Sequence, residues 1–391
     1  MRILVTGSAG HLGEALVRTL RRADHDVVGL DAKASPFTDV VGSIADRACV
    51  ARCVRGVEAV LHTATLHKPH IAMYAAQAFV DTNVSGTLAL LEAASDAGVG
   101  AFVFTSTTSV FGDALVPPPG DPAAWITEST APVPKNIYGV TKRAAEDLCE
   151  MFHRRRGLPC IVLRTSRFFP EEDDNPAVSG RYADGNVKAN EFLYRRVEIE
   201  DVVDAHLLAL QRARSIGFGR YIVSATTPFA PDDVAELRTD APRVVARRCP
   251  EYAAEFRRRG WSMFPSIERV YVNERARRDL GWGRATTSAT SSSGCAPTPI
   301  RAAGSRSRSA TRATVERRVA LDDAERARET ECADAVVDSG SRRRLARSAE
   351  IAAGRRQGER RTDRADRAAL RLPQRPGCDR RRGRRSSQTR A

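Results

Sequence analysis

The stretch Ile3-Leu-Val-Thr-Gly7-Ser-Ala-Gly10-His-Leu-Gly13 decides the fold, because an apolar run stands directly before three glycines spaced three apart. The residues that follow, Glu14-Ala-Leu-Val-Arg18, have the apolar spacing of a helix. At such a junction the glycines let the chain turn tightly, let the backbone approach a pyrophosphate and let the helix pack on the strand. The stretch therefore predicts a dinucleotide site, with contacts from Gly7, Gly10, His11, Leu12 and Gly13.

An acidic residue, Asp31, ends the second apolar run of the chain. A carboxylate at this position binds the 2′-hydroxyl of a cofactor ribose and repels a 2′-phosphate. We therefore expect NAD rather than NADP, although Lys33 would offset part of that repulsion.

Short apolar runs alternate with amphipathic stretches from residue 2 to about 165. Strands are predicted at 3–5, 27–30, 59–62, 101–104 and 160–163, and helices at 13–22, 82–97 and 138–155. This alternation is typical of an α/β protein with a doubly wound parallel sheet. After Arg164 we expect loops at 170–176, a helix at 199–213, a strand at 219–224 and a helix at 272–280. Since ligands bind beyond the carboxyl ends of such strands, we expect residues 166–283 to form a substrate cap on a cofactor domain at 1–165.

Tyr138 and Lys142 stand four residues apart at the start of a predicted helix, so they share one face. An ammonium near a phenol favours the phenolate, which would let the tyrosine act as a base below its ordinary pKa of about 10. The same spacing occurs on many solvated helices. The hydroxyl-rich stretch Phe104-Thr-Ser-Thr107-Thr-Ser-Val-Phe-Gly112, upstream at the end of an apolar run, makes the catalytic reading the stronger one.

In this order and spacing, the glycine turn, the hydroxyl cluster and the Tyr138/Lys142 pair resemble the extended short-chain dehydrogenases/reductases of the NAD-dependent epimerase/dehydratase family, in particular UDP-glucose 4-epimerase-like members. The resemblance implies a Rossmann-type doubly wound parallel sheet with a small C-terminal cap. It places the catalytic hydroxyl at Thr107, beside Tyr138 and Lys142, which also contact the cofactor. It implies further cofactor contacts at Ser43, Ile44, Ala64 and Asn83. Ser43 departs from the aspartate usual in the family, and it is a weaker acceptor for an adenine amino group.

Within the family that this chain resembles, the residues that follow the catalytic hydroxyl, here Thr107, differ between reaction types. Dehydratases and decarboxylases carry carboxylic side chains there, whereas this chain has Thr108 and Ser109. Without a carboxyl group to protonate a leaving hydroxyl, we expect hydride transfer with Tyr138 as acid and base rather than elimination. Both an epimerase and a plain alcohol dehydrogenase fit this chemistry.

The part of the sequence expected to bind the substrate resembles nucleotide-sugar enzymes less closely than the cofactor-binding part does. Only about 30 residues separate Arg164 from the segment at 197–204, and the arginine usual before that segment aligns with Tyr194, one and two places before Arg195 and Arg196. We expect Asp201 to have a structural role in the acidic turn that caps a helix of the cap. The candidate substrate contacts are the hydroxyl residues Thr107 and Thr108 together with Arg167, His67 and His70. We expect His62 to be a core histidine.

The net charge of +14 is confined to one end of the chain. Residues 1–283 have 35 Lys+Arg and 35 Asp+Glu, a net of 35 − 35 = 0, and residues 284–391 have 27 and 13, a net of 27 − 13 = +14. The latter segment has no Phe, Tyr, Trp or Lys, so we expect it to be disordered. Shifting a frame that encodes Pro-Arg-Tyr-Asp-Phe-Arg-His-Val-Leu by one nucleotide reproduces residues 284–291. We therefore predict a frameshift near Gly283, which resequencing of that stretch tests.

Cysteine spacing and hydropathy limit the remaining choices. The eight cysteines show no zinc-type or redox-type spacing, so we expect free thiols, no metal and a reducing compartment. An apolar strand begins at the N-terminus and no run is long enough for a membrane span, so the cytoplasm is expected, with no membrane partner. A homodimer is an expectation from the resemblance alone.

Three functions stay open at this stage. The first is an NAD-dependent epimerase or oxidoreductase of a sugar or polyol-like small molecule. The second is a simple NAD-dependent dehydrogenase of a non-nucleotide alcohol or aldose. The third, disfavoured because the basic segment is attributed to a frameshift, is an Arg-rich nucleic-acid-binding protein with a degenerate enzyme domain.

Overall fold

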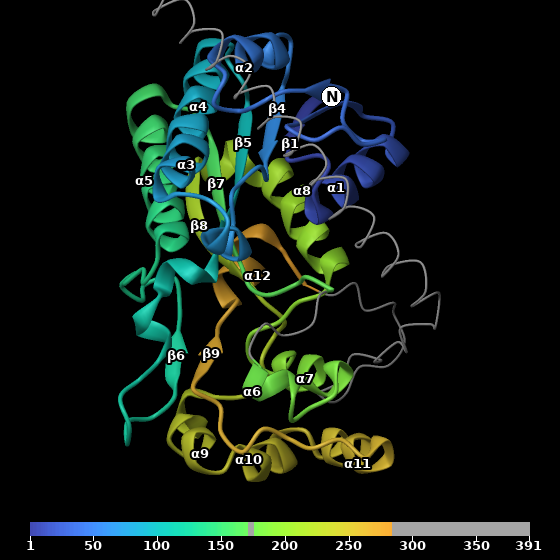
Figure 1. Ribbon diagram of the computed structural model, residues 1–391, viewed down its shortest axis with the longest axis vertical. Coiled ribbons are helices and arrows are strands. Elements are labelled where there is room, and N and C mark those ends of the chain that lie inside the picture. The colour runs from blue at the N-terminus through green and yellow to red at the C-terminus, as the bar shows by residue number, and fades with distance from the viewer. Residues whose placement is uncertain (171–175, 284–391) are drawn as a thin grey trace, which may run out of the picture. The chain divides into compact units, whose positions relative to one another are not determined.

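The computed structural model describes residues 1–170 and 176–283, and a seven-stranded parallel sheet lies at the centre of this part (Figure 1). From β1, the strand order runs outward through β2 and β3 on one side and through β4 on the other. In sheets of this kind, ligands bind beyond the carboxyl ends of the strands at this point of divergence. The strands, in spatial order, are β3 (Val40–Val41), β2 (Asp26–Asp31), β1 (Arg2–Thr6), β4 (Ala59–His62), β5 (Ala101–Thr107), β7 (Cys160–Thr165) and β8 (Phe218–Val223).

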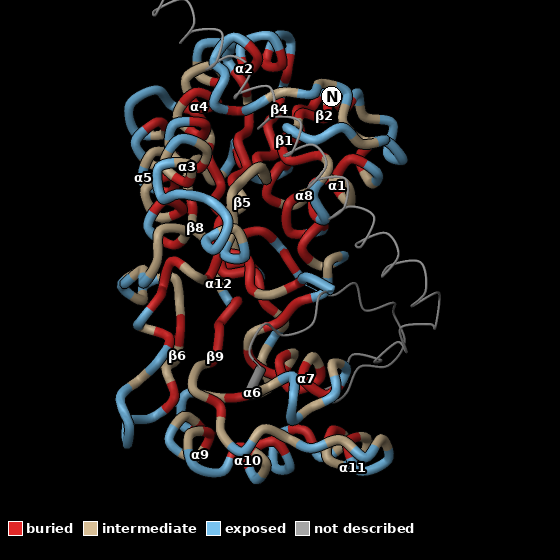
Figure 2. Tube along the Cα trace, viewed as in Figure 1, coloured by how far each residue is buried: buried red, intermediate tan, exposed pale blue. Residues whose placement is uncertain are grey.

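Helices cover both faces of the sheet, so the strands are buried along most of their length (Figure 2). Alternate side chains of one strand enter different layers: Ile3 and Val5 pack with one set of helices and Leu4 with the other. The first set is α1 (His11–Arg22), α8 (Ile199–Ile216) and α12 (Glu274–Leu280). The second set is α2 (Arg47–Val54), α4 (Thr87–Asp96) and α5 (Ile137–Arg156).

A smaller layer lies beyond the carboxyl ends of the strands. Its own apolar core includes Leu193, Leu237 and Val244, and two further strands pair in parallel within it. Its elements are β6 (Ala124–Ile126), β9 (Arg269–Tyr271), α6 (Pro176–Ser179), α7 (Asp184–Glu191), α9 (Val234–Thr239), α10 (Ala241–Arg248) and α11 (Pro250–Arg259). The short connecting elements of the chain are η1 (Lys68–Ala72), α3 (Ala76–Phe79), the π-helix η2 (Val80–Gly86), η3 (Thr108–Phe111), η4 (Asp113–Leu115) and η5 (Pro231–Asp233).

The predicted fold class is confirmed, and three details differ from the sequence prediction. The helix and strand expected in the cap, at 199–213 and 219–224, are α8 and β8, which belong to the central layers because β8 extends the sheet and α8 packs on it. The helix expected at 82–97 begins as the π-helix η2. The helix expected at 272–280 is preceded by β9, and α12 starts only at Glu274. The assignment of a cofactor domain and a substrate cap stays a prediction.

Several expectations concern residues that are only partly described. The loop at 170–176 falls largely outside the described residues, and the disorder and frameshift predicted for 284–391 fall entirely outside them. The five cysteines of the described part, Cys49, Cys53, Cys149, Cys160 and Cys249, are buried and form no disulfide with one another. No helix of residues 1–170 and 176–283 is long and apolar enough to cross a membrane.

Candidate active site

The glycine turn between β1 and α1 has the geometry that a dinucleotide phosphate requires. Gly7 has a φ of +76°, and a Cβ on Gly13 would lie 1.9 Å from the carbonyl oxygen of Gly7. A Cβ on Gly10 would instead meet that oxygen at 3.2 Å and no other described atom within 4 Å. Gly10 is exposed and begins α1, and no side chain of the described residues caps it. The turn therefore leaves both space and free amide groups for an anion.

The expected ribose and adenine contacts lie along the edge formed by β2 and β3. The Asp31 carboxylate accepts hydrogen bonds from the main-chain nitrogens of Ala9, at 3.0 Å, and Lys33, at 2.8 Å. Its oxygens keep lone pairs for a ribose hydroxyl. Ser43 is exposed, and its hydroxyl accepts from the nitrogen of Ala45 at 3.1 Å, whereas Ile44 is buried. The positions of Asp31, Ser43 and Ile44 are compatible with the ribose and adenine contacts that the sequence predicts.

The side chains of two predicted cofactor residues, Leu12 and Asn83, are engaged within the protein. The Leu12 side chain is buried in the core, so only its main chain faces the turn. Asn83 is buried and uses both ends of its amide: Oδ1 accepts from Thr65 Oγ1 and Leu66 N, and Nδ2 donates to Leu66 O and Thr141 Oγ1. Asn83 thus fixes the loop that follows β4, which includes Ala64, against α5.

His62 is the core histidine that the sequence predicts. It is 1% exposed, and its ring nitrogens lie 2.8 Å from Thr6 Oγ1 and 2.9 Å from Thr87 Oγ1. Burial, and then the charge of Lys142, hold its pKa well below the ordinary value. His62 is therefore neutral and internally satisfied.

Tyr138 and Thr107 meet at the carboxyl end of β5. Thr107 is the last residue of β5, and Tyr138 lies in the first turn of α5, which Asn136 caps by accepting from Gly139 N at 2.9 Å. Burial raises the pKa of Tyr138 to about 12, and a hydrogen bond with the Thr107 side chain acts in the opposite direction. The pKa of Tyr138 is therefore raised, rather than lowered as the sequence predicts, because desolvation of the phenolate outweighs the favourable contact.

Lys142 lies one helical turn further along α5 and is 2% exposed. Its Nζ donates to the main-chain oxygen of Thr105 at 2.6 Å and lies 4.0 Å from the centroid of the Phe104 ring. Burial lowers the pKa of Lys142 to about 7, against the opposing charge of Glu146. The ammonium and the phenol are thus held on one helix face beside the end of β5, as the sequence predicts.

The turn after Thr107 carries no carboxyl group at its first two positions. Thr108 is buried, and Ser109 donates its main-chain nitrogen to Thr107 Oγ1 at 3.1 Å. The two residues lie in η3, which contacts α5. Nothing at these positions could protonate a leaving hydroxyl as a carboxylic acid does.

The candidate substrate residues from two distant segments lie together. The ring of His67 stacks on that of Phe169 with centroids 5.8 Å apart, and it lies 4.3 Å from the ring of His70. His11, from the glycine turn, lies 6.4 Å from the same Phe169 ring. Arg167 lies two residues before Phe169, with its Nη1 3.7 Å from Glu191 Oε1. His67 and His11 therefore flank the Phe169 ring, which brings the loop after β4 close to the glycine turn, whereas the Arg167 side chain points to Glu191.

The arginines next to Tyr194 are engaged within the protein. Arg196 is 4% exposed and its Nη1 donates to Glu191 Oε2 at 2.9 Å, while Tyr194 itself is buried. Asp201 lies in the first turn of α8, where its main-chain oxygen accepts from Trp282 Nε1 at 2.9 Å. Asp201 thus has a structural contact, although in a sheet-packing helix rather than in the cap.

Sequence reasoning missed a buried ion pair behind the site. Glu146, one turn beyond Lys142, is 0% exposed and binds Arg164 of β7, which is 1% exposed. The signal was present, because Tyr138, Lys142 and Glu146 repeat at intervals of four and continue one helix face.

A parallel sheet with a glycine turn, an acidic ribose position and a Tyr/Lys/Thr cluster defines the class of Rossmann-type, NAD-binding enzymes. Residues 3–223 match the model of the NAD dependent epimerase/dehydratase family. The chain belongs to this family and uses NAD.

Characterised relatives cover more than one reaction. UDP-glucose 4-epimerase from Lactobacillus helveticus is 29% identical over 245 residues, which are 54% of this chain and 72% of that protein. dTDP-glucose 4,6-dehydratase from Streptomyces niveus is 36% identical over 191 residues, 44% of this chain and 55% of that one. Uronate dehydrogenase from Pseudomonas syringae pv. tomato is 28% identical over 186 residues, 46% of this chain and 63% of that one.

A solved structure extends the likeness over the described residues. A short-chain dehydrogenase/reductase superfamily protein from Agrobacterium tumefaciens with bound NAD superposes with a TM-score of 0.52 and 26% identity, covering 72% of this chain and 92% of that one.

Proposed function

We propose that the chain is an NAD-dependent sugar epimerase or oxidoreductase that works by reversible hydride transfer, with Tyr138, Lys142 and Thr107 as its catalytic set. The observation that carries this proposal is that Lys142, on the same face of α5 as Tyr138, donates to the main-chain oxygen of Thr105 at 2.6 Å, beside the strand end where the Thr107 side chain acts on Tyr138. The family to which the chain belongs supports the reaction class.

The residues of the glycine turn fit the cofactor. We propose that the amide groups of His11 and Leu12 bind the pyrophosphate, which would lie close to Gly10, since α1 begins there without a side-chain cap and the Gly10 nitrogen itself donates to Gly7 O at 3.0 Å. Asp31 would bind the adenine ribose, and Ser43 and Ile44 would contact the adenine. Ala64 would line the cofactor through the loop after β4, and Asn83 would position that loop.

Each catalytic residue has one task in this scheme. Thr107 Oγ1 hydrogen-bonds the substrate oxygen, and the Tyr138 hydroxyl exchanges a proton with the same oxygen. NAD held at the glycine turn would supply a reversible hydride acceptor for the substrate carbon. The charged form of Lys142 favours the phenolate of Tyr138. Thr108 and Ser109 supply no carboxylic acid, so the proposal does not include elimination of water, despite the dehydratase among the relatives.

A net dehydrogenase is the second candidate. At the position where nucleotide-sugar enzymes are expected to carry an arginine, this chain has the buried Tyr194, and the adjacent Arg196 is bound to Glu191. A small polyhydroxylated or anionic substrate without a nucleotide would then meet Thr108, Arg167, His67 and His70. The likeness to a uronate dehydrogenase supports this candidate.

A panel of free and nucleotide-linked sugars tests both candidates. Incubation with NAD and detection of NADH, followed by chromatography of the sugar, separates them: an epimerase yields a new sugar without net NADH, and a dehydrogenase accumulates NADH. A protein that binds no NAD, or whose activity is unchanged in Tyr138→Phe, would refute the proposal.

A further inference from the structure

Three consecutive residues at the end of β5 each contact α5. The main-chain oxygen of Thr105 accepts from Lys142, the hydroxyl of Ser106 donates to Glu146 Oε1 at 2.6 Å, and the side chain of Thr107 lies close enough to Tyr138 to lower its pKa. The partners on α5 repeat every four residues, so one helix face lies along the strand end.

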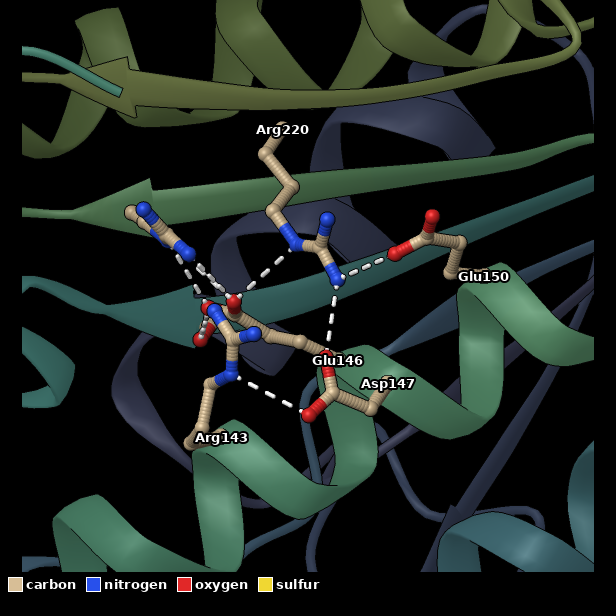
Figure 3. Close-up of polar contacts among 7 residues, drawn as sticks. Arg143, Glu146, Asp147, Glu150 and Arg220 are labelled. Carbon is tan, nitrogen blue, oxygen red and sulfur yellow. Dashed lines mark hydrogen bonds and ion pairs between the residues drawn. The ribbon is translucent and has the colours of Figure 1, made fainter. Parts of the chain in front are cut away.

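Glu146, the partner of Ser106, is the centre of a polar cluster (Figure 3). Arg164 of β7 forms a fork on Glu146, with Nε 3.0 Å from Oε1 and Nη2 2.7 Å from Oε2. Arg220 of β8 adds a contact of 3.3 Å to Glu146 Oε2 and bridges to Asp147 at 3.0 Å and Glu150 at 2.8 Å. The cluster therefore joins α5 to β5, β7 and β8.

Stability alone does not account for such a pair, because apolar residues of similar volume stabilise a protein core at least as well as a buried ion pair does. We propose that Glu146, held by Ser106 and Arg164, is a positioning residue of the hydride-transfer site that fixes the end of β5 against the catalytic face of α5 and keeps Lys142 in its charged form. This inference rests on the proposed function of Tyr138, Lys142 and Thr107.

The groups around Lys142 explain why a nearby carboxylate is needed. From β5 it meets the Phe104 ring and the Thr105 oxygen, from β4 the neutral His62, and from α5 Glu146 and Cys149. Burial favours the neutral amine and lowers the pKa of Lys142, and Glu146 is the largest influence that raises it. The Cys149 thiol cannot replace it, because burial holds the pKa of Cys149 well above its ordinary value.

The titration of Lys142 tests the proposal without a substrate. The chain has five lysines, so protein containing lysine labelled with ¹³C at Cε gives one NMR signal for each, and Lys142→Arg assigns the signal of interest. We expect Glu146→Gln to move the titration midpoint of Lys142 to lower pH by about 1 unit. Asp147→Asn is the matched control, since Asp147 is the neighbouring carboxylate of the same cluster and half-exposed, and it should leave the midpoint unchanged. An unchanged midpoint in Glu146→Gln overturns the proposal.

Glu146→Gln leaves Arg164 buried without its partner and could fail to fold. The double variant Glu146→Gln/Arg164→Met removes both charges, so it should fold and still show the lowered midpoint; a midpoint at the wild-type pH in this variant also overturns the proposal. With a substrate in hand, the basic limb of the pH profile of kcat should move in the same direction, with KM little changed. If the chain proves to catalyse a different reaction, the NMR shift still stands as the measure of Glu146 acting on Lys142.

Discussion

The side-chain nitrogen of Lys142 lies 2.6 Å from the main-chain oxygen of Thr105, which ties the ammonium of α5 to the strand that carries Thr107. This contact and the Phe104 ring provide some of the stabilisation that water would give a charged lysine. They do not replace all of it, since burial lowers the pKa of Lys142 to about 7. The catalytic face of α5 thus includes a lysine whose charge changes near neutral pH.

The titration of Lys142 predicts how stability depends on pH. Its pKa is about 7 in the folded chain and 10.5 ordinarily, so the unfolded chain binds more protons between these values, and folding stability contributed by this group rises with pH across that window. Lys142→Met removes this dependence. Its free energy of unfolding relative to wild type should therefore be highest below pH 7 and fall as the pH rises toward 10. Urea denaturation at several pH values measures this, and Lys135→Met, at an exposed lysine, should show no such slope.

Tyr138→Phe should remove hydride transfer while NAD still binds. The variant keeps the ring and loses the hydroxyl that exchanges a proton with the substrate, so we expect kcat to fall by about 10² to 10⁴. Calorimetric NAD affinity should stay within about a factor of three, because uncharged phenol contributes little to a site built mainly by the glycine turn. Tyr182→Phe, at a tyrosine that packs on Phe264, is the control and should retain wild-type kcat. Equal activity in the two variants would contradict the assigned role of Tyr138.

Local sequence patterns sufficed for the sheet and for most of the candidate site. The glycine turn could be predicted because two of its constraints are local: Gly7 has a φ of +76°, and a Cβ on Gly13 would lie 1.9 Å from the Gly7 oxygen. The Tyr138/Lys142 pair could be predicted because helical spacing places the two residues on one face. The buried His62 followed from its place in an apolar strand.

Contacts between residues far apart in the chain could not be predicted from such local patterns. Glu146 pairs with Arg164 and Arg220, which come from strands 18 and 74 residues further along the chain, and no local pattern marks them as partners. The raised pKa of Tyr138 depends on how much water the folded site excludes, which spacing does not reveal. The place of β8 beside β7, rather than in the cap, depends on the path of the chain through residues 166–217.

Alanine at Gly13 and at Gly10 should have different effects. A methyl group at Gly13 would collide with the Gly7 oxygen, so Gly13→Ala should destabilise the fold by about 1–3 kcal/mol. A methyl group at Gly10 would meet the same oxygen at 3.2 Å, a tight contact that a small shift can relieve, and it would occupy the space proposed for the pyrophosphate. Gly10→Ala should therefore lower the Tm much less than Gly13→Ala and bind NAD at least tenfold more weakly. Thermal denaturation and calorimetry separate the two, and unchanged NAD affinity in Gly10→Ala would place the phosphate elsewhere.

Asp31 should control the choice between NAD and NADP. Its carboxylate lies at the end of β2, bonded to the main-chain nitrogens of Ala9 and Lys33, and would face the adenine ribose. Asp31→Ser removes a charge that repels a 2′-phosphate and leaves Lys33 beside it. We expect the NAD affinity to fall by about tenfold or more, since a hydrogen bond to a charged group contributes about 1.5–3 kcal/mol, and the NADP affinity to rise. Asp26→Ser, at the exposed opposite end of the same strand, removes an equal charge far from the turn along β2 and should leave both affinities unchanged. If the two variants change the NAD and NADP affinities alike, the effect comes from net charge, and the ribose lies away from Asp31.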